Sequence, residues 1–223
     1  MAAPATLGEA CHWVSNPPTA DVPARQDCVS CVRLLGRPAA GKSARSPVVG
    51  LPSAGGVAPC AGGCAGESLA LHDEPMTVTL RSPAFEPGAP IPARFDHERG
   101  DLSPALAWDG VPEGTAALVL LVDDPDAPVE GSFVHWVLYN FDPARQGRAE
   151  GEEPAEAAAG ANGFGRPGYL GPAPPPGDDP HHYIFRLLAV DQPVPLTGLP
   201  CCQDVGTAVT GHILGEARLT GTC

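Results

Sequence analysis

Lysine is almost absent from this sequence of 223 residues: Lys42 is the single one, and none follows it. After Pro75 the chain carries eight arginines against twenty acidic residues, so −12 of the formal net charge of −13 lies in that part. A domain of this sign repels phosphate backbones and anionic membrane surfaces. The composition therefore argues against nucleic acid as a partner.

Long hydrophobic runs are also missing. No segment approaches the roughly 18 apolar residues that a membrane-spanning helix needs, and the N-terminus lacks the basic stretch and apolar core of a signal peptide. We therefore predict a cytoplasmic protein without stable membrane insertion. Aromatic residues make up only 5% of the chain, whereas 28 prolines and 27 glycines favour short strands and many loops over a helical bundle.

The first 75 residues have neither a helical nor a strand period and contain few large apolar side chains. Such a segment cannot offset a backbone entropy cost of about 1–2 kcal/mol per residue by burying surface. We predict a disordered extension, residues 1–75, followed by a β domain, residues 76–223. A start codon assigned too far upstream would equally explain the extension.

The extension carries two cysteine pairs, Cys28-x-x-Cys31 and Cys60-x3-Cys64, each spaced like half of a zinc knuckle. The gap between the pairs is longer than in common zinc sites, and no strand or turn pattern surrounds them. We favour incidental cysteines over a structural zinc, and we predict no metal and no cofactor.

From Met76 onward the pattern is that of a β protein. Short segments that alternate in polarity or are apolar throughout predict strands, and these are Met76–Arg81, Leu106–Trp108, Ala116–Val122, Val134–Phe141, Tyr183–Val190 and Arg218–Gly221. Gln203–Gly215 has near-helical spacing, and Gly147–Gly165 is a polar connection. We predict an all-β fold, mainly an antiparallel, Greek-key-like sandwich, with one or two short helices near the C-terminus.

Two carboxylates and two histidines follow a common pattern of rigid loop and apolar strand. Asp124 and Asp126 lie in a proline-fixed turn directly after one predicted strand, and His135 opens the next. His181 follows a loop of four prolines and precedes a further strand. Neighbouring strands of one sheet would bring all four to one edge. Carboxylates beside imidazoles favour the cationic ring, and cationic rings with free backbone N–H groups bind small anions.

Plainer interpretations stand beside this one. The Asp124–Asp126 segment has the composition of an Asx turn, in which the side chains bond their own backbone. His212 fits a packing role on the predicted helix, His97 a solvated loop, and His182 the opposite face of its strand from His181.

The motifs resemble those of the phosphatidylethanolamine-binding protein family, in particular its bacterial, Raf-kinase-inhibitor-like branch. The resemblance runs from Met76 to the C-terminus. It includes, besides the Asp-Pro-Asp-Ala-Pro turn and the His-Trp strand start, Ser103-Pro104 with Trp108, Asn162-Gly-Phe-Gly165, Tyr169-Leu-Gly-Pro172, the proline-rich loop before His-x-Tyr, and Gly211-His-Ile-Leu214. This chain has Ala173 where many bacterial members have cysteine, and His182 where an arginine is common.

The resemblance implies a β-sandwich with a small cavity that binds phosphate or phosphorylated headgroups. The family's ligand positions correspond here to Asp124, Asp126, His135, Gly171, Pro172, His181 and Tyr183. We predict a binding module for a small phosphorylated or carboxylated ligand, which could regulate a partner protein as a kinase inhibitor does. None of the motif residues is placed as an activated nucleophile.

The alternative function is an enzyme that uses the histidines and carboxylates for acid–base or metal-assisted chemistry. An exposed edge strand could also pair two copies of the chain as a homodimer.

Overall fold

The computed structural model describes residues 77–152 and 157–223, so the extension that we predicted to be disordered lies outside the described residues. The described chain forms two antiparallel sheets. The smaller sheet has the order β1 (Thr79–Arg81), β2 (Leu106–Asp109) and β5 (Gly147–Arg148). The larger sheet has the order β6 (Ala158–Ala159), β4 (Phe133–Phe141), β3 (Ala117–Asp124), β7 (His182–Val190) and β8 (Ile213–Thr222).

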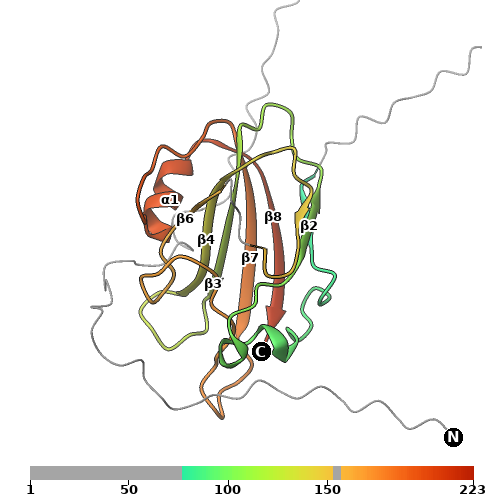
Figure 1. Cartoon of the computed structure of the whole chain (residues 1–223), viewed down its shortest axis with the longest axis vertical. Helices are drawn as coiled ribbons and strands as arrows, with labels where there is room; N and C mark the ends of the chain where they lie inside the picture. Colours follow the sequence, from blue (N-terminus) through green and yellow to red (C-terminus); the bar gives the residue numbers. More distant parts are fainter. Residues whose placement is uncertain (1–76, 153–156) are drawn as a thin grey trace, which may run out of the picture. The chain divides into compact units, whose positions relative to one another are not determined.

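Helical structure is limited to short segments. The α-helix α1 spans Cys202–Val209, and two 3₁₀ turns, η2 (Ala93–Phe95) and η3 (His97–Arg99), connect β1 to β2. The helix α1 and the smaller sheet cover opposite faces of the larger sheet (Figure 1). The predicted fold class, two packed antiparallel sheets with a short helix near the C-terminus, is confirmed.

The strand β3 forms the buried centre of the larger sheet. All eight of its residues are buried, because β4 and β7 flank it and both of its faces are covered. Its side chains alternate between two apolar clusters. Leu118, Leu120 and Val122 pack between the sheets, whereas Val119 and Leu121 pack on the α1 side.

The last helix differs from our prediction. We predicted a helix over Gln203–Gly215, but α1 ends at Val209, and Ile213–Gly215 already belong to β8. Gly211 has a φ of 86°, which ends the helical path. His212 therefore lies in the turn between α1 and β8, half-exposed and 2.9 Å from Asp191, so a packing role among apolar helix residues was wrong.

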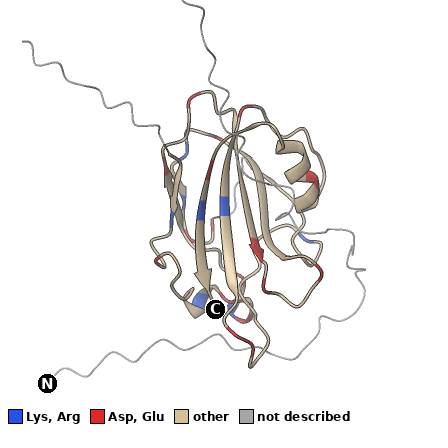
Figure 2. Cartoon of the chain, turned by 180° about the vertical axis from the view of Figure 1, so that it is seen from behind, with Lys and Arg blue, Asp and Glu red and all other residues tan. Residues whose placement is uncertain are grey.

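A buried ion pair crosses the larger sheet on its α1 side. Asp123 of β3 and Arg186 of β7 are 1% and 2% exposed, with 3.6 Å between carboxylate and guanidinium. Ser132 donates a hydrogen bond of 2.7 Å to the same carboxylate. Arg186 is the cross-strand neighbour of Arg218, and basic segments mark the middle of two adjacent strands, whereas most acidic residues lie in loops (Figure 2).

Within the described ranges, no helix has both the length and the apolar character that a membrane span requires.

Candidate functional site

The antiparallel topology brings three predicted site segments to one end of the larger sheet. The end of β3 pairs with the start of β4, because Asp124 is the partner of Phe133. The start of β7 lies on the other side of β3, where Asp123 is the partner of Ile184. The same end of the larger sheet therefore holds Asp124, His135 and His181, although 57 residues separate Asp124 from His181.

A β-bulge places His135. Val122 pairs with Trp136 and Asp123 pairs with Val134, so His135 is the extra residue in β4. Two reciprocal hydrogen bonds hold it: the Leu170 N–H donates to the His135 carbonyl at 2.9 Å, and His135 Nδ1 lies 2.8 Å from the Leu170 carbonyl. Because a carbonyl only accepts, Nδ1 carries the proton. The bulge thus fixes both the ring and its tautomer.

His135 is neutral at pH 7. Burial lowers the pKa of its imidazole to about 4, although the Leu170 carbonyl and the Asp124 carboxylate act in the opposite direction. The ring packs edge-on against Phe133 and Tyr183, with centroid distances of 5.1 and 5.0 Å. We expected cationic histidines from the sequence, and for His135 that expectation was wrong.

This shift predicts a stability change with pH. A histidine with a pKa of 6.5 when unfolded and about 4 when folded stabilises the protein fully above pH 6.5, and this contribution of about 3 kcal/mol is lost as the pH falls toward 4. Burial also raises the pKa of Asp96 to about 6, which has the opposite effect over the same range. The contribution of His135 is therefore measured as the difference in unfolding free energy between the wild type and a variant without this histidine, in which the effect of Asp96 cancels.

The test is urea unfolding of the wild type and His135→Asn at pH 7 and at about pH 4.5. Asparagine can still donate to the Leu170 carbonyl but does not titrate. We expect the destabilisation caused by His135→Asn to shrink on acidification. An unchanged difference between the two proteins would contradict a buried neutral histidine.

Asp124 orients His181. Its Oδ2 lies 2.8 Å from His181 Nδ1, and the two side chains are 4% and 5% exposed. Its other oxygen, Oδ1, accepts the N–H groups of Asp126 and Ala127 at 2.8 and 3.1 Å. The Asx turn and the histidine partner thus coexist, because each uses a different oxygen. The second ring nitrogen of His181 lies 3.7 Å from Asp178.

Asp126 turns away from the buried pair. Its Oδ2 accepts from the His182 backbone N–H at 2.8 Å and contacts His182 Nδ1 at 2.7 Å, and both side chains are exposed. We expected both Asp124 and Asp126 in one pocket with the histidines and left His182 aside. The structure pairs Asp126 with His182, whereas Asp124 contacts His181.

The loop before β7 is anchored by its backbone. The Gly171 N–H donates to Asp101 Oδ1 at 2.8 Å, and the Pro172 carbonyl accepts from the His97 N–H at 3.1 Å. The Ala173 backbone lowers the pKa of the Tyr183 hydroxyl, against the larger and opposite effect of burial. We expected this loop to expose backbone N–H groups, yet that of Gly171 already has a partner.

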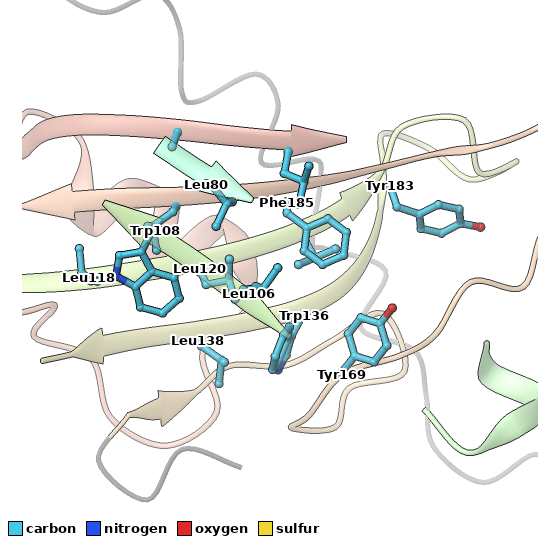
Figure 3. Packing of buried hydrophobic residues seen from close by; sticks show 14 of the residues in the cluster. Leu80, Leu106, Trp108, Leu118, Leu120, Trp136, Leu138, Tyr169, Tyr183 and Phe185 are labelled. Atoms are coloured by element: carbon cyan, nitrogen blue, oxygen red, sulfur yellow. The ribbon is translucent and has the colours of Figure 1, made fainter. Parts of the chain in front are cut away.

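Two tyrosine hydroxyls lie at the same end of the core between the sheets (Figure 3). The Tyr183 hydroxyl can act both as a donor and as an acceptor. Tyr169 is 6% exposed, and its hydroxyl is buried with no hydrogen-bond partner among the residues described. Burial raises the pKa of both hydroxyls, so both are protonated.

Our sequence-based set did not include Tyr169, Leu170 or Asp101. Tyr169 belongs to a motif that carried the family resemblance, and this was a signal that could have identified it. Leu170 lies in the same motif but acts through its backbone carbonyl, which a pattern of side chains does not indicate. Asp101 acts through a contact across 70 residues, so no local pattern indicates it.

Comparisons with known proteins agree on one family. The sequence profile described as "Phosphatidylethanolamine-binding protein" matches residues 81–223. A Mycobacterium tuberculosis protein that carries the name lipoprotein LppC is 41% identical over 67% of this chain and 72% of its own length. A UPF0098 protein of Methanothermobacter thermautotrophicus is 40% identical over 65% of this chain and 97% of its own.

Solved structures are similar too. A homolog from Chlamydia trachomatis, CT736, has 35% identity and a TM-score of 0.63, covering 66% of this chain and 97% of that one. Escherichia coli YbcL, described as a member of the mammalian PEBP family, has 30% identity and a TM-score of 0.62 over 65% and 96%. Together with the bulged histidine and the paired Asp124 and His181, these matches lead to one conclusion: the chain belongs to the phosphatidylethanolamine-binding protein family.

Proposed function

We propose that this protein binds a small phosphorylated or carboxylated ligand at the cluster formed by Asp124, His135, His181 and Tyr183. The observation that carries the proposal is the buried pair of Asp124 and His181. It holds the His181 imidazole at the end of the larger sheet, with Nδ1 2.8 Å from Asp124 and Nε2 3.7 Å from Asp178, and within this proposal the anion binds beside that ring.

The neighbouring groups support an anionic ligand. The Tyr183 hydroxyl can donate to a ligand oxygen, because burial raises its pKa and keeps it protonated. The family resemblance supports a role for Gly171 and Pro172 in the ligand site as well, and hydrogen bonds join their loop to Asp101 and His97. Within this proposal their role is to hold the loop in place, and that of Asp126 is to fix the turn beside His182.

The test is titration calorimetry with inorganic phosphate and phosphoethanolamine on the wild type and Asp124→Asn. Asparagine keeps the acceptor for the turn N–H groups but loses the charge opposite His181. A charge-assisted contact is worth about 1.5–3 kcal/mol, so we expect affinity to fall about 10- to 100-fold.

The matched control is Asp191→Asn. It removes a carboxylate from an imidazole at a similar distance, 2.9 Å from His212, but at the far end of β7. This variant should bind like the wild type. If neither ligand binds the wild type, the proposed function is wrong.

The second part of the proposal is that the protein regulates a partner protein, as a kinase inhibitor does. It follows from the family resemblance alone. The predicted homodimer also stays a prediction; β8 lies at an edge of the larger sheet, and sedimentation of the purified protein would decide it.

The cytoplasmic location likewise stays a prediction. Cys202 and Cys223 are both disulfide-bonded, which is typical of oxidising compartments, and one relative carries the name of a lipoprotein. Fractionation of the native cells, with thiol labelling of the recovered protein, would distinguish a cytoplasmic location from an oxidising compartment.

The enzyme alternative stays a prediction. Over residues 77–152 and 157–223, no three His, Cys, Asp or Glu side chains come together in a metal-ligand arrangement.

A further inference from the structure

Two cysteines of the β domain take part in disulfide bonds. They are Cys202, the first residue of α1, and Cys223, the residue after β8. A disulfide requires Cα atoms that lie about 4.4–6.8 Å apart. The places of the two residues in the fold therefore decide whether they can be bonded to each other.

The larger sheet separates Cys202 from Cys223. Cys201, which precedes Cys202, forms a β-bridge with Ala161 just after β6. Cys223 follows β8, and β6 and β8 are the outermost strands in the order β6-β4-β3-β7-β8, so four strand spacings of about 4.8 Å lie between them. The two cysteines also pack with apolar clusters on opposite faces of this sheet, and α1 and the C-terminus lie toward different ends of it (Figure 1). Cys202 and Cys223 therefore do not bond to each other.

Cys201 is not the partner of either residue. It keeps its thiol, and its sulfur accepts the backbone N–H of Asp204 in the first turn of α1. After Pro75 the sequence holds no cysteine other than Cys201, Cys202 and Cys223. The two disulfide partners therefore lie among the cysteines of the first 75 residues, which are Cys11, Cys28, Cys31, Cys60 and Cys64.

We propose that two disulfides, one at Cys202 and one at Cys223, tie the extension, residues 1–75, covalently to the β domain. This inference gives a role to cysteines that we interpreted as incidental from their spacing, and it does not depend on the proposed function. Each bond forms from two thiols, which give two electrons and two protons to a disulfide oxidant such as oxidised glutathione, and the oxidant becomes two thiols. The extension is therefore tied to the domain in an oxidising compartment and released in a reducing one.

Cys223 attaches the extension at the end of the sheet that holds the candidate site. Its N–H donates to the His181 carbonyl at 3.1 Å, and its carbonyl accepts from the His181 N–H at 2.9 Å. The His181 side chain contacts Asp124 in that site. A closed disulfide at Cys223 thus ties the extension beside a site residue, and reduction of the disulfide releases the extension from this place.

Cyanogen bromide provides the test, because it cleaves a chain after methionine. Met1 and Met76 are the only methionines of the sequence, so cleavage separates the extension from residues 77–223 unless disulfides join them. The full chain is oxidised with glutathione disulfide, its remaining thiols are blocked, and the cleavage products are compared by mass with and without dithiothreitol. We expect the extension to stay attached without the reductant and to be lost completely with it.

Serine variants identify the attachment points. Cys202→Ser and Cys223→Ser should each keep the extension attached through the other cysteine, whereas the double variant should release it without a reductant. Cys201→Ser is the matched control beside Cys202, because serine also caps a helix, and both attachments should remain in it. Peptide mapping of the unreduced wild type assigns the partner of each cysteine, a readout that does not need a folded variant.

Several results would overturn the inference. They are loss of the extension from the oxidised wild type without a reductant, retention of the extension in the double variant, and a mapped peptide that links Cys202 to Cys223 or links two copies of the chain at these cysteines. A native protein whose mass lacks the first 75 residues would overturn it as well. None of these measurements involves ligand binding, so the proposed function is tested separately.

Discussion

Gly171→Ala should destabilise the protein by about 3 kcal/mol and abolish ligand binding. A Cβ at this position would lie 2.2 Å from the Phe95 carbonyl oxygen and 2.4 Å from backbone atoms of Asp96 and His97. These are backbone atoms of η2 and η3, so relief requires movement of a turn rather than rotation of a side chain. Overpacking of this kind costs about 1–3 kcal/mol and occasionally more.

The same movement would disturb the site. The Gly171 N–H donates to Asp101, and the carbonyl of the adjacent Leu170 accepts from His135. Thermal unfolding measures the first effect, with an expected decrease of about 6–12 °C in Tm, and phosphate calorimetry measures the second.

Gly206→Ala is the matched control. A Cβ on this α1 residue meets no atom within 4 Å outside its own helix, so alanine should stabilise by about 0.5–1 kcal/mol through its helix propensity. Equal stability changes of the two variants would contradict the close backbone contact at Gly171.

Asp123→Leu should cost about 3–5 kcal/mol in the free energy of unfolding. Asp123 and Arg186 are almost fully buried and 3.6 Å apart. Without the carboxylate, Arg186 stays charged because a guanidinium does not lose its proton in proteins, and a buried, uncompensated charge is strongly destabilising. Urea unfolding at pH 7 measures the loss.

The reverse substitution, Arg186→Met, should cost less and should depend on pH. Burial raises the pKa of Asp123 despite the opposing effect of Arg186, so removal of the arginine raises it further and lets the carboxyl stay neutral. A raised pKa means that the folded state binds the proton more tightly, so this contribution is greatest in acid and is lost as the pH rises through the folded-state pKa. Arg186→Met should therefore approach the wild type on acidification, whereas Asp123→Leu should not. Equal costs for both variants at every pH would exclude this asymmetry.

The strands were the most predictable part of the molecule. The predicted segments Ala116–Val122 and Val134–Phe141 became β3, Ala117–Asp124, and β4, Phe133–Phe141, because a continuously apolar run is covered on both faces. The end of α1 was not predictable from spacing, because Ile213 continues the helical period while Gly211 breaks the backbone path.

The sequence by itself determined the strands, their apolar alternation, the rigid turn at Asp124 and the family to which these motifs belong. Only the tertiary structure decided which acid meets which histidine, since the bulge at His135 and the pairing of β3 with β7 select Asp124 for His181 and leave Asp126 to His182. It also decided the charge of His135, because burial depends on residues such as Leu170, Phe133 and Tyr183 that meet only in the fold. Local chemistry indicates which groups can titrate, and the environment that folding builds around them sets whether they do.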